Sequence, residues 1–331
     1  MTTAVTSALT TALTVQDLEV HYGQVKAVRG VSFDVADGSV LGLVGESGSG
    51  KSTVARAVVG LAHSTGTMRM RGVDLSGSSR EARRQRRKVQ LIFQDSRSSL
   101  DPRFTVEDCV REGLDGSAYR SRREASARVA ELLEMVSLDP SVGRSRPGNL
   151  SGGQRQRVAI ARALAAEPEV LIADEVTASL DVSVQAVVLN LLRRLQHELG
   201  LTMIFISHNL AVVRYMCDDL AVMFNGRIVE LGSVEGVIDR PEHPYTRSLL
   251  AAVPEIGERR LLSDAGTETA IGEPAPPGGC DYHLRCPVGP TADPDRSICV
   301  TADPTAGAAH RLHRANCHFA PEVTGERARV R

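Results

Sequence analysis

The sequence predicts an α/β fold, because short apolar strands alternate with segments of helical composition. Two runs are typical of strands buried in a parallel sheet: residues 170–173, which are all apolar, and residues 201–206. Residues 154–166 and 184–199 have helical composition, and each of these segments precedes one of the two runs. Strands and helices that alternate in this way indicate a parallel sheet with helices packed on it. The 331-residue chain is 42% hydrophobic, which is enough to build such a core.

Further elements are predicted from shorter patterns along the chain. Strands are expected over 13–22 and 30–44, with a turn at Asp37-Gly38 inside the second stretch. Residues 107–136 are rich in Arg, Ala and Glu, with apolar residues at helical spacing, and therefore predict helix. Asn225-Gly226 lies between apolar runs over 220–231 and predicts a β-hairpin.

The two ends of the chain differ from its middle. Residues 1–12 are expected to form a disordered tail, since they lack the basic start of a signal peptide. After about Pro254 the composition changes to Gly, Pro, Ala, Thr and Asp, and helical periodicity fades. We therefore expect a loop-rich C-terminal region, which holds four of the six cysteines.

Composition and charge argue against several classes of protein. The net charge is −1, with no tryptophan and 3% aromatic residues, so neither a nucleic-acid partner nor a base-stacking surface is expected. No apolar run approaches 18 residues, so no membrane span is predicted. Two basic runs, at 80–88 and 120–123, are interpreted as solvated helix faces, because no aromatic residues interleave them.

A glycine-rich loop follows the apolar run 40–44 and precedes a helical segment at 54–59. Strand, loop and helix in this order are the context of a phosphate-binding loop, whose backbone N–H groups and helix dipole hold an oxyanion. The lysine is expected to reach the β- and γ-phosphates, and the serine after it to bind Mg²⁺. A Gly/Ser-rich turn is the alternative, and it leaves the Lys-Ser pair unexplained. The predicted loop residues are Gly45, Glu46, Ser47, Gly48, Ser49, Gly50, Lys51, Ser52 and Thr53.

Two adjacent carboxylates end the apolar run at 170–173. Asp174 is placed to hold Mg²⁺, directly or through water, and Glu175 to polarise the water that attacks a γ-phosphate. A solvated loop would also explain two acids. The glycine loop about 120 residues earlier favours the catalytic interpretation.

The segment after Leu150 carries a more specific pattern, and with it a family resemblance. Ser151, Gly152, Gly153 and Gln154, followed by Arg-Gln-Arg, resemble the signature of ATP-binding-cassette (ABC) ATPases. Small residues at a helix start offer N–H groups and a hydroxyl to a γ-phosphate. In that family they serve the ATP held by the opposite subunit.

Other elements of the family match in order over about residues 14–235. Tyr22 resembles the aromatic residue that stacks on adenine, and Gln94 the glutamine that senses Mg²⁺ and the membrane subunit. Ser179-Leu180-Asp181 resembles the loop that crosses the dimer interface, and His208 the histidine that contacts the γ-phosphate. A single tyrosine or histidine is usually structural, so the ordered set carries the resemblance.

The resemblance implies a RecA-like phosphate-loop core with an antiparallel β-subdomain and a helical subdomain at about 96–160. It implies an ABC nucleotide-binding domain over 13–253 that hydrolyses ATP with Mg²⁺. Two such domains would sandwich two ATP molecules, so a second nucleotide-binding subunit, identical or homologous, is expected as a partner.

The match narrows to the ATP-binding subunits of oligopeptide and dipeptide permeases, a branch that includes nickel importers. Residues 94–103, 180–185 and 241–246 resemble this branch, and residues 279–287 resemble its C-terminal extension, expected over 234–320. The resemblance implies import of peptides as part of a translocase with two membrane-spanning permease subunits and an extracytoplasmic solute-binding protein. It implies a location on the cytoplasmic face of the inner membrane. Nickel or another small solute as cargo, a soluble cassette ATPase and an added redox-sensing role are the alternatives.

Three positions depart from the branch's usual pattern. Ser96 and Val176 stand where proline is usual, and Asn209 replaces the aspartate after His208. Since valine leaves φ free where proline fixes it, Val176 is expected to change turnover without abolishing it.

The C-terminal cysteines are Cys280, Cys286, Cys299 and Cys317, separated by five, twelve and seventeen residues. In a cytosolic protein such clustering favours a metal over disulfides. Four thiolates would hold Zn²⁺ or a [4Fe–4S] cluster, and a nearby histidine can replace one sulfur around zinc. In the resembled permeases the extension is associated with an iron–sulfur cluster; four free thiols in a loop remain the alternative. The nearby histidines are His283, His310, His313 and His318.

Overall fold

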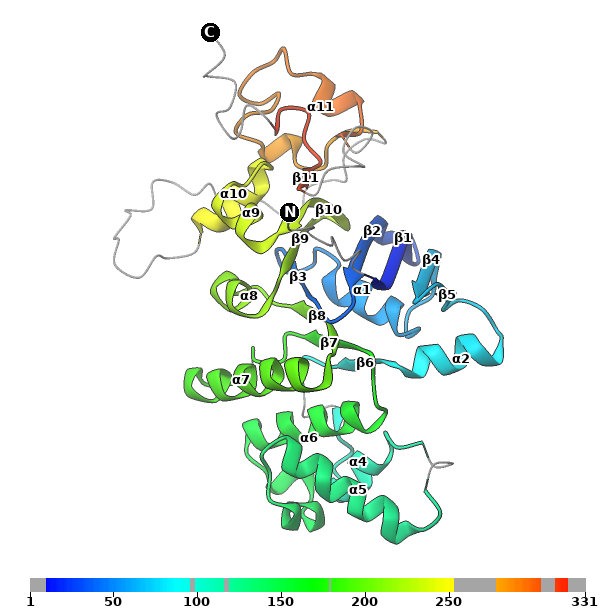
Figure 1. Ribbon diagram of the computed structural model, residues 1–331. Coiled ribbons are helices and arrows are strands. Elements are labelled where there is room, and N and C mark those ends of the chain that lie inside the picture. Colours follow the sequence, from blue (N-terminus) through cyan, green and yellow to red (C-terminus); the bar gives the residue numbers. More distant parts are fainter. Residues whose placement is uncertain are drawn as a thin grey trace, which may run out of the picture. The chain divides into compact units, whose positions relative to one another are not determined.

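The computed structural model describes residues 10–95, 99–115, 119–178, 180–252, 278–304 and 313–320. The chain divides into two compact units (Figure 1). The first unit comprises Met1–Gly42 and Ser52–Ser207, and the second Leu43–Lys51 and His208–Arg331. Ser96 and Ser179, His310 and most of the predicted N-terminal tail lie outside the described residues. In the described part of the chain, no helix has both the length and the apolar character needed to cross a bilayer.

An antiparallel sheet forms one part of the first unit, with strand order β2-β1-β4-β5. Val15 and Leu18 of β1 are both buried, although two exposed residues separate them, because the pairing of β1 with β2 shifts register there. Leu18 pairs with Val31 across β2. The predicted strand at 13–22 is confirmed, but β1 begins two residues earlier, so the predicted disordered tail at 1–12 is wrong for its last two residues, which pair with β2 or pack in the core. Strand β2 begins five residues earlier than the predicted 30. The strands are β1 (Thr11–Tyr22), β2 (Val25–Ala36), β4 (Ser64–Met70) and β5 (Val73–Asp74).

A parallel sheet forms the other part of the first unit, and its strands follow the order β3-β8-β7-β6. All residues of β3, β7 and β8 are buried, which explains why these segments are mainly apolar and show no alternation of polar and apolar residues. Ile172 pairs in parallel with Leu91 on one side and with Ile204 on the other. The strands are β3 (Val40–Val44), which continues into the second unit, β6 (Val89–Ile92), β7 (Val170–Asp174) and β8 (Thr202–Ile206).

Helices pack around these sheets, and α6 contacts both α7 and β6 (Figure 1). The prediction of continuous helix over 107–136 is wrong, because helix is absent from its described residues between α4 and α5. Gly113 follows α4 where a Cβ would lie 2.3 Å from the carbonyl oxygen of Arg162, and Ser121 caps a new helix. The helices are α1 (Lys51–Val58), α2 (Arg80–Arg87), α4 (Val106–Arg111), α5 (Arg122–Met135), η1 (Pro140–Arg144), η2 (Pro147–Asn149), α6 (Gly152–Ala165) and α7 (Val182–Leu199).

The second unit contains the strand order β11-β10-β9-β3 and several short helices. Asn225 and Gly226 both have positive φ, at 45° and 79°, and form the predicted hairpin turn. Valines of β9 and α8 pack with Tyr245 and Tyr282 into one buried cluster. The elements are α8 (Leu210–Met216), β9 (Asp219–Phe224), β10 (Arg227–Ser233), α9 (Val234–Asp239), α10 (Pro244–Ala251), η3 (His283–Arg285), α11 (Ile298–Thr301) and β11 (Arg314–Ala315).

Candidate functional site

The glycine loop connects β3 to α1, as the motif predicts. Lys51 begins α1, is only 6% exposed and turns its ammonium back across the loop. Its Nζ donates to the carbonyl oxygens of Gly45 and Glu46, at 2.9 and 2.8 Å, and to Ser49 Oγ at 3.3 Å. The ammonium is thus held over the concave side of the loop by oxygen atoms of the loop itself.

The glycines of this loop are required by its backbone and by its neighbours. Gly48 and Gly50 have φ of 80° and 103°, values that residues other than glycine rarely adopt. A Cβ at Gly45 would lie 2.1 Å from the carbonyl oxygen of Met223 in β9. The carbonyl oxygen of Ser49 accepts a hydrogen bond from the N–H of Gly226, at 2.9 Å. Strand β9 and its hairpin turn therefore fix the loop.

In the first unit, Ser52 and Asp174 meet although 122 residues separate them in the sequence. Ser52 Oγ donates to Asp174 Oδ1 at 3.0 Å, and Asp174 is 4% exposed at the end of β7. A hydroxyl and a carboxylate are the oxygen donors that Mg²⁺ prefers. The donor set therefore fits the predicted magnesium site.

Glu175 has an unusual backbone and a short contact to Gln94. Its φ is +44°, a left-handed conformation that is uncommon outside glycine and is often found at functional sites. Its N–H donates to the carbonyl oxygen of Ile206, at 3.1 Å. Gln94 Nε2 donates to Glu175 Oε2 at 2.7 Å. Val176, which replaces the usual proline, is 1% exposed, so its side chain belongs to the core.

The signature residues have local structural roles. Ser151 caps α6, with its Oγ accepting from the N–H of Gln154 at 3.2 Å, and Gln154 Oε1 accepts from the N–H of Ser151 at 2.9 Å. This reciprocal pair is a capping box. Gly153 is buried, and a Cβ there would lie 2.5 Å from Val184 Cγ1 in α7. A Cβ at Gly152 would lie 3.3 Å from Leu180 Cδ2.

The other predicted residues lie at the ends of elements. Tyr22 ends β1 and is half exposed, as a stacking platform requires. Thr53 lies in the first turn of α1. Asp181 caps α7 by accepting from the N–H of Val184 at 3.0 Å. His208 is exposed in the second unit, and Asn209 caps α8 through its Oδ1, so the change from aspartate preserves the cap.

The four C-terminal cysteines line one enclosed cavity of about 10 Å³. Burial raises the pKa of Cys280 to about 11 and that of Cys317 to about 12, so both thiols are protonated at neutral pH. All six cysteines are free. Among the residues that the structure describes, no three His, Cys, Asp or Glu side chains are disposed to hold a metal ion.

The histidines near these cysteines divide into two groups. His283 and His318 line the cavity, together with His243, which the sequence analysis did not single out. His313 instead forms a hydrogen bond to Glu230, with 2.8 Å between its Nε2 and Glu230 Oε1. That hydrogen bond is the main cause of a raised pKa of His313.

Two residues that contact the phosphate loop were missed by the motif analysis. Tyr245 Oη accepts a hydrogen bond from the N–H of Glu46 at 2.9 Å, and Arg285 approaches the Glu46 carboxylate at 3.4 Å. Tyr245 lies in the segment 241–246, which the sequence analysis used only as a family marker. The signal available in the sequence was an aromatic residue directly after Pro244, which begins α10.

Comparisons with known proteins agree with this geometry. Residues 28–178 match the family model "ABC transporter", and residues 229–292 match "Oligopeptide/dipeptide transporter, C-terminal region". A Brucella ovis protein provisionally named as a peptide import ATP-binding protein is 47% identical over 291 residues, covering 84% of this chain and 90% of that protein. The di/tripeptide transport ATP-binding protein DppF of Pseudomonas aeruginosa is 43% identical over 290 residues, covering 84% and 90%.

A solved structure is similar as well. The dimeric post-hydrolysis structure of the ATP-binding cassette MJ0796, bound to ADP and phosphate, matches with a TM-score of 0.60 and 28% identity. The match covers 67% of this chain and 98% of that one. The fold and its phosphate loop define an ATPase of the ATP-binding-cassette class, which hydrolyses ATP. The chain belongs to the family of ATP-binding subunits of oligopeptide and dipeptide ABC transporters.

Proposed function

We propose that the chain powers import of di- and oligopeptides as the nucleotide-binding subunit of a membrane transporter. The observation that carries this proposal is that one chain combines the cassette with the peptide-transporter extension, over 28–178 and 229–292. The names of its relatives support peptides as cargo. We propose that the nucleotide-binding domain spans 13–253, with a helical subdomain at about 96–160, and that the extension spans 234–320.

The phosphate loop and α1 hold the triphosphate in this proposal. Backbone N–H groups of the loop, apart from that of Glu46, would surround the phosphates, and Lys51 would neutralise the β- and γ-phosphates. Ser52 and Asp174 would hold Mg²⁺, which supplies charge neutralisation on the phosphates when bound. Thr53, in the first turn of α1, would also take part in nucleotide binding, and the half-exposed ring of Tyr22 would stack on adenine.

Hydrolysis begins when Glu175 accepts a proton from the water that attacks the γ-phosphorus. The bond between the γ-phosphorus and the β,γ-bridging oxygen breaks, and ADP and inorganic phosphate leave. His208 contacts the γ-phosphate. Gln94 donates a hydrogen bond to Glu175, so the position of Gln94 would control the orientation of the Glu175 carboxylate towards the attacking water.

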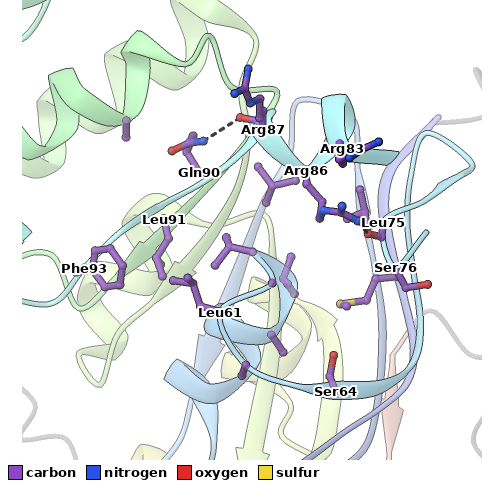
Figure 2. Close-up of a pocket in the computed structure, with 18 of the residues that line it drawn as sticks. Leu61, Ser64, Leu75, Ser76, Arg83, Arg86, Arg87, Gln90, Leu91 and Phe93 are labelled. Atoms are coloured by element: carbon purple, nitrogen blue, oxygen red, sulfur yellow. Dashed lines mark hydrogen bonds between the residues drawn. The ribbon is translucent and has the colours of Figure 1, made fainter. Parts of the chain in front are cut away.

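We further propose that a groove in the first unit receives a cytoplasmic segment of the permease (Figure 2). The groove has a volume of about 1240 Å³. Leu61 and Phe93 lie on its lining, with Leu61 62% exposed, and Arg83, Arg86 and Arg87 lie along one side (Figure 2). Apolar side chains beside arginines fit a helix that carries both apolar and acidic side chains.

The groove is linked directly to the candidate base. Gln90, Leu91 and Phe93 line the groove, and the next residue along the chain is Gln94. Because Gln94 donates to Glu175 at 2.7 Å, displacement of this segment by a docked helix would move the hydrogen bond on the base. This short path supports coupling between docking and hydrolysis.

The remaining partners belong to the same proposal. A second nucleotide-binding subunit, identical or homologous, would complete each ATP site through its Ser151–Gln154 segment, and Asp181 would lie at that interface. The dimeric cassette bound to ADP and phosphate supports this arrangement. Two permease subunits would hold the chain at the cytoplasmic face of the inner membrane, and an extracytoplasmic solute-binding protein would deliver the peptide.

The test compares uptake by cells that carry the wild-type chain or the Glu175→Gln variant as the sole cassette subunit. Labelled di- and oligopeptides and Ni²⁺ are supplied in parallel. Loss of peptide uptake alone supports the proposal. Loss of Ni²⁺ uptake alone would show that Ni²⁺ is the cargo and that the mechanism is unchanged. Unchanged uptake of both would refute a transport role.

We propose that the four C-terminal cysteines hold a [4Fe–4S] cluster, with Zn²⁺ as the alternative. The support is that all four thiols line one cavity, and thiolates suit both groups. The cavity must widen on binding, because its volume is about 10 Å³. Protein purified without oxygen should contain iron and sulfide, lost in Cys286→Ser and kept in Cys109→Ser. Stoichiometric zinc or the absence of metal would overturn the cluster.

A further inference from the structure

One side chain of the segment 241–246 contacts the phosphate loop from outside it. Tyr245 lies in the first turn of α10, and its side chain is 1% exposed. Its Oη accepts a hydrogen bond from the backbone N–H of Glu46, at 2.9 Å. The second residue of the phosphate loop is therefore held by a tyrosine 199 positions later in the chain.

The peptide group between Gly45 and Glu46 is fixed at both of its polar atoms. Its N–H donates to Tyr245 Oη, and its carbonyl oxygen, which belongs to Gly45, accepts from Lys51 Nζ at 2.9 Å. Because a peptide group is planar, the orientation of the N–H fixes the direction of the carbonyl oxygen. The tyrosine hydroxyl thus fixes the position of the Gly45 carbonyl oxygen, to which the lysine ammonium donates.

The hydroxyl itself is held in place by its surroundings. The ring of Tyr245 packs against Phe224 and Tyr282, with centroid separations of 4.7 and 5.5 Å. Its N–H donates to His243 Nδ1 at 3.1 Å, which caps α10. The fully buried Glu230 carboxylate accepts from the N–H of His243 at 3.0 Å. A side chain fixed at both backbone and ring presents its oxygen with little freedom.

We propose that Tyr245 is a positioning residue for Lys51. Its hydroxyl orients the Gly45–Glu46 peptide so that the Gly45 carbonyl oxygen holds the lysine ammonium ready for the phosphates of ATP. The inference rests on the proposed function in one respect, the role of Lys51 in phosphate binding. Without the hydroxyl the N–H of Glu46 loses its partner, and the peptide is free to rotate towards another one.

The experiment measures ATP affinity of the full-length Tyr245→Phe variant by calorimetry. Loss of one neutral hydrogen bond predicts a dissociation constant raised about five-fold. Tyr282→Phe is the matched control, because its hydroxyl contacts Ser248 at 3.1 Å and not the loop. Arg285→Gln is a second control: it removes the half-exposed ion pair to the Glu46 carboxylate and the contact of the guanidinium with the Phe224 ring, and it keeps the Tyr245 hydroxyl. A change of about twofold or less is expected.

A second measurement detects the contact without nucleotide. Hydrogen exchange at the Glu46 amide should accelerate in Tyr245→Phe and stay at the wild-type rate in Tyr282→Phe. A loss of general stability would accelerate exchange throughout the second unit, whereas a lost positioning contact acts at Glu46.

Two results distinguish failure of this inference from failure of the proposed function. Wild-type ATP affinity in Lys51→Ala would refute the phosphate-loop assignment, and with it the role of Tyr245. If Lys51→Ala abolishes binding while Tyr245→Phe matches Tyr282→Phe in affinity and in exchange at Glu46, the positioning role alone is refuted.

Discussion

Replacement of Gly153 by alanine separates the two roles that a signature glycine can have, close packing and nucleotide contact. A Cβ at this position would lie 2.5 Å from Val184 Cγ1, far inside van der Waals contact. The two helices α6 and α7 must then move apart, and overpacking of this kind costs about 1–3 kcal/mol. For a unit of this size a loss of about 2 kcal/mol lowers Tm by about 4–8 °C.

The compensating change is Val184→Ala, which removes the atom that would clash. On its own it should cost about 1 kcal/mol, since Val184 is only partly buried. The double variant Gly153→Ala/Val184→Ala should be more stable than Gly153→Ala alone, as measured by thermal and urea denaturation. Gly152→Ala, with its nearest atom at 3.3 Å, is the matched control and should lose little.

Activity then distinguishes the two roles. If Gly153 serves packing alone, the double variant regains ATPase activity together with stability. Recovery of stability without activity would show that the glycine backbone also faces nucleotide. A Gly153→Ala variant as stable as the wild type, or one that Val184→Ala does not rescue, would refute the packing argument.

Three further predictions concern catalysis and pH. Lys51→Ala should abolish ATP binding in an equilibrium titration, because the ammonium that faces the phosphates is lost; affinity within a few-fold of wild type would contradict this. Glu175→Gln should accumulate an ATP-bound dimer in size-exclusion chromatography, and continued turnover would show that another group polarises the water. His313→Ala should destabilise the protein by about 1–3 kcal/mol at low pH, because a charge-assisted hydrogen bond to Glu230 is lost. Since that bond raises the pKa of His313 above its ordinary 6.5, its contribution is complete below pH 6.5. It is lost as pH rises through the raised pKa, so the stability difference from wild type should shrink there; a pH-independent difference would contradict the assignment.

Much of the fold followed from local sequence patterns. The buried strands β7 and β8 are mainly apolar without alternation, and the β9–β10 turn needs positive φ at two positions, which Asn225-Gly226 supplies. Strand β4 was not predicted, because Ser64–Met70 contains no apolar run and is held by pairing with β1. The break between α4 and α5 was also missed, since the helical spacing of apolar residues continues across it.

The sequence by itself determined the phosphate loop, the carboxylates after β7 and the hairpin, because each depends on residues adjacent along the chain. Only the tertiary structure decided which distant side chains act on them. Ser52 meets Asp174, Gln94 meets Glu175, and Tyr245 meets Glu46 across separations of 122, 81 and 199 residues. The four cysteines likewise share one cavity only after folding. Such contacts depend on how sheets and helices pack. A motif specifies the local backbone conformation, but it does not specify which distant residues will lie next to it.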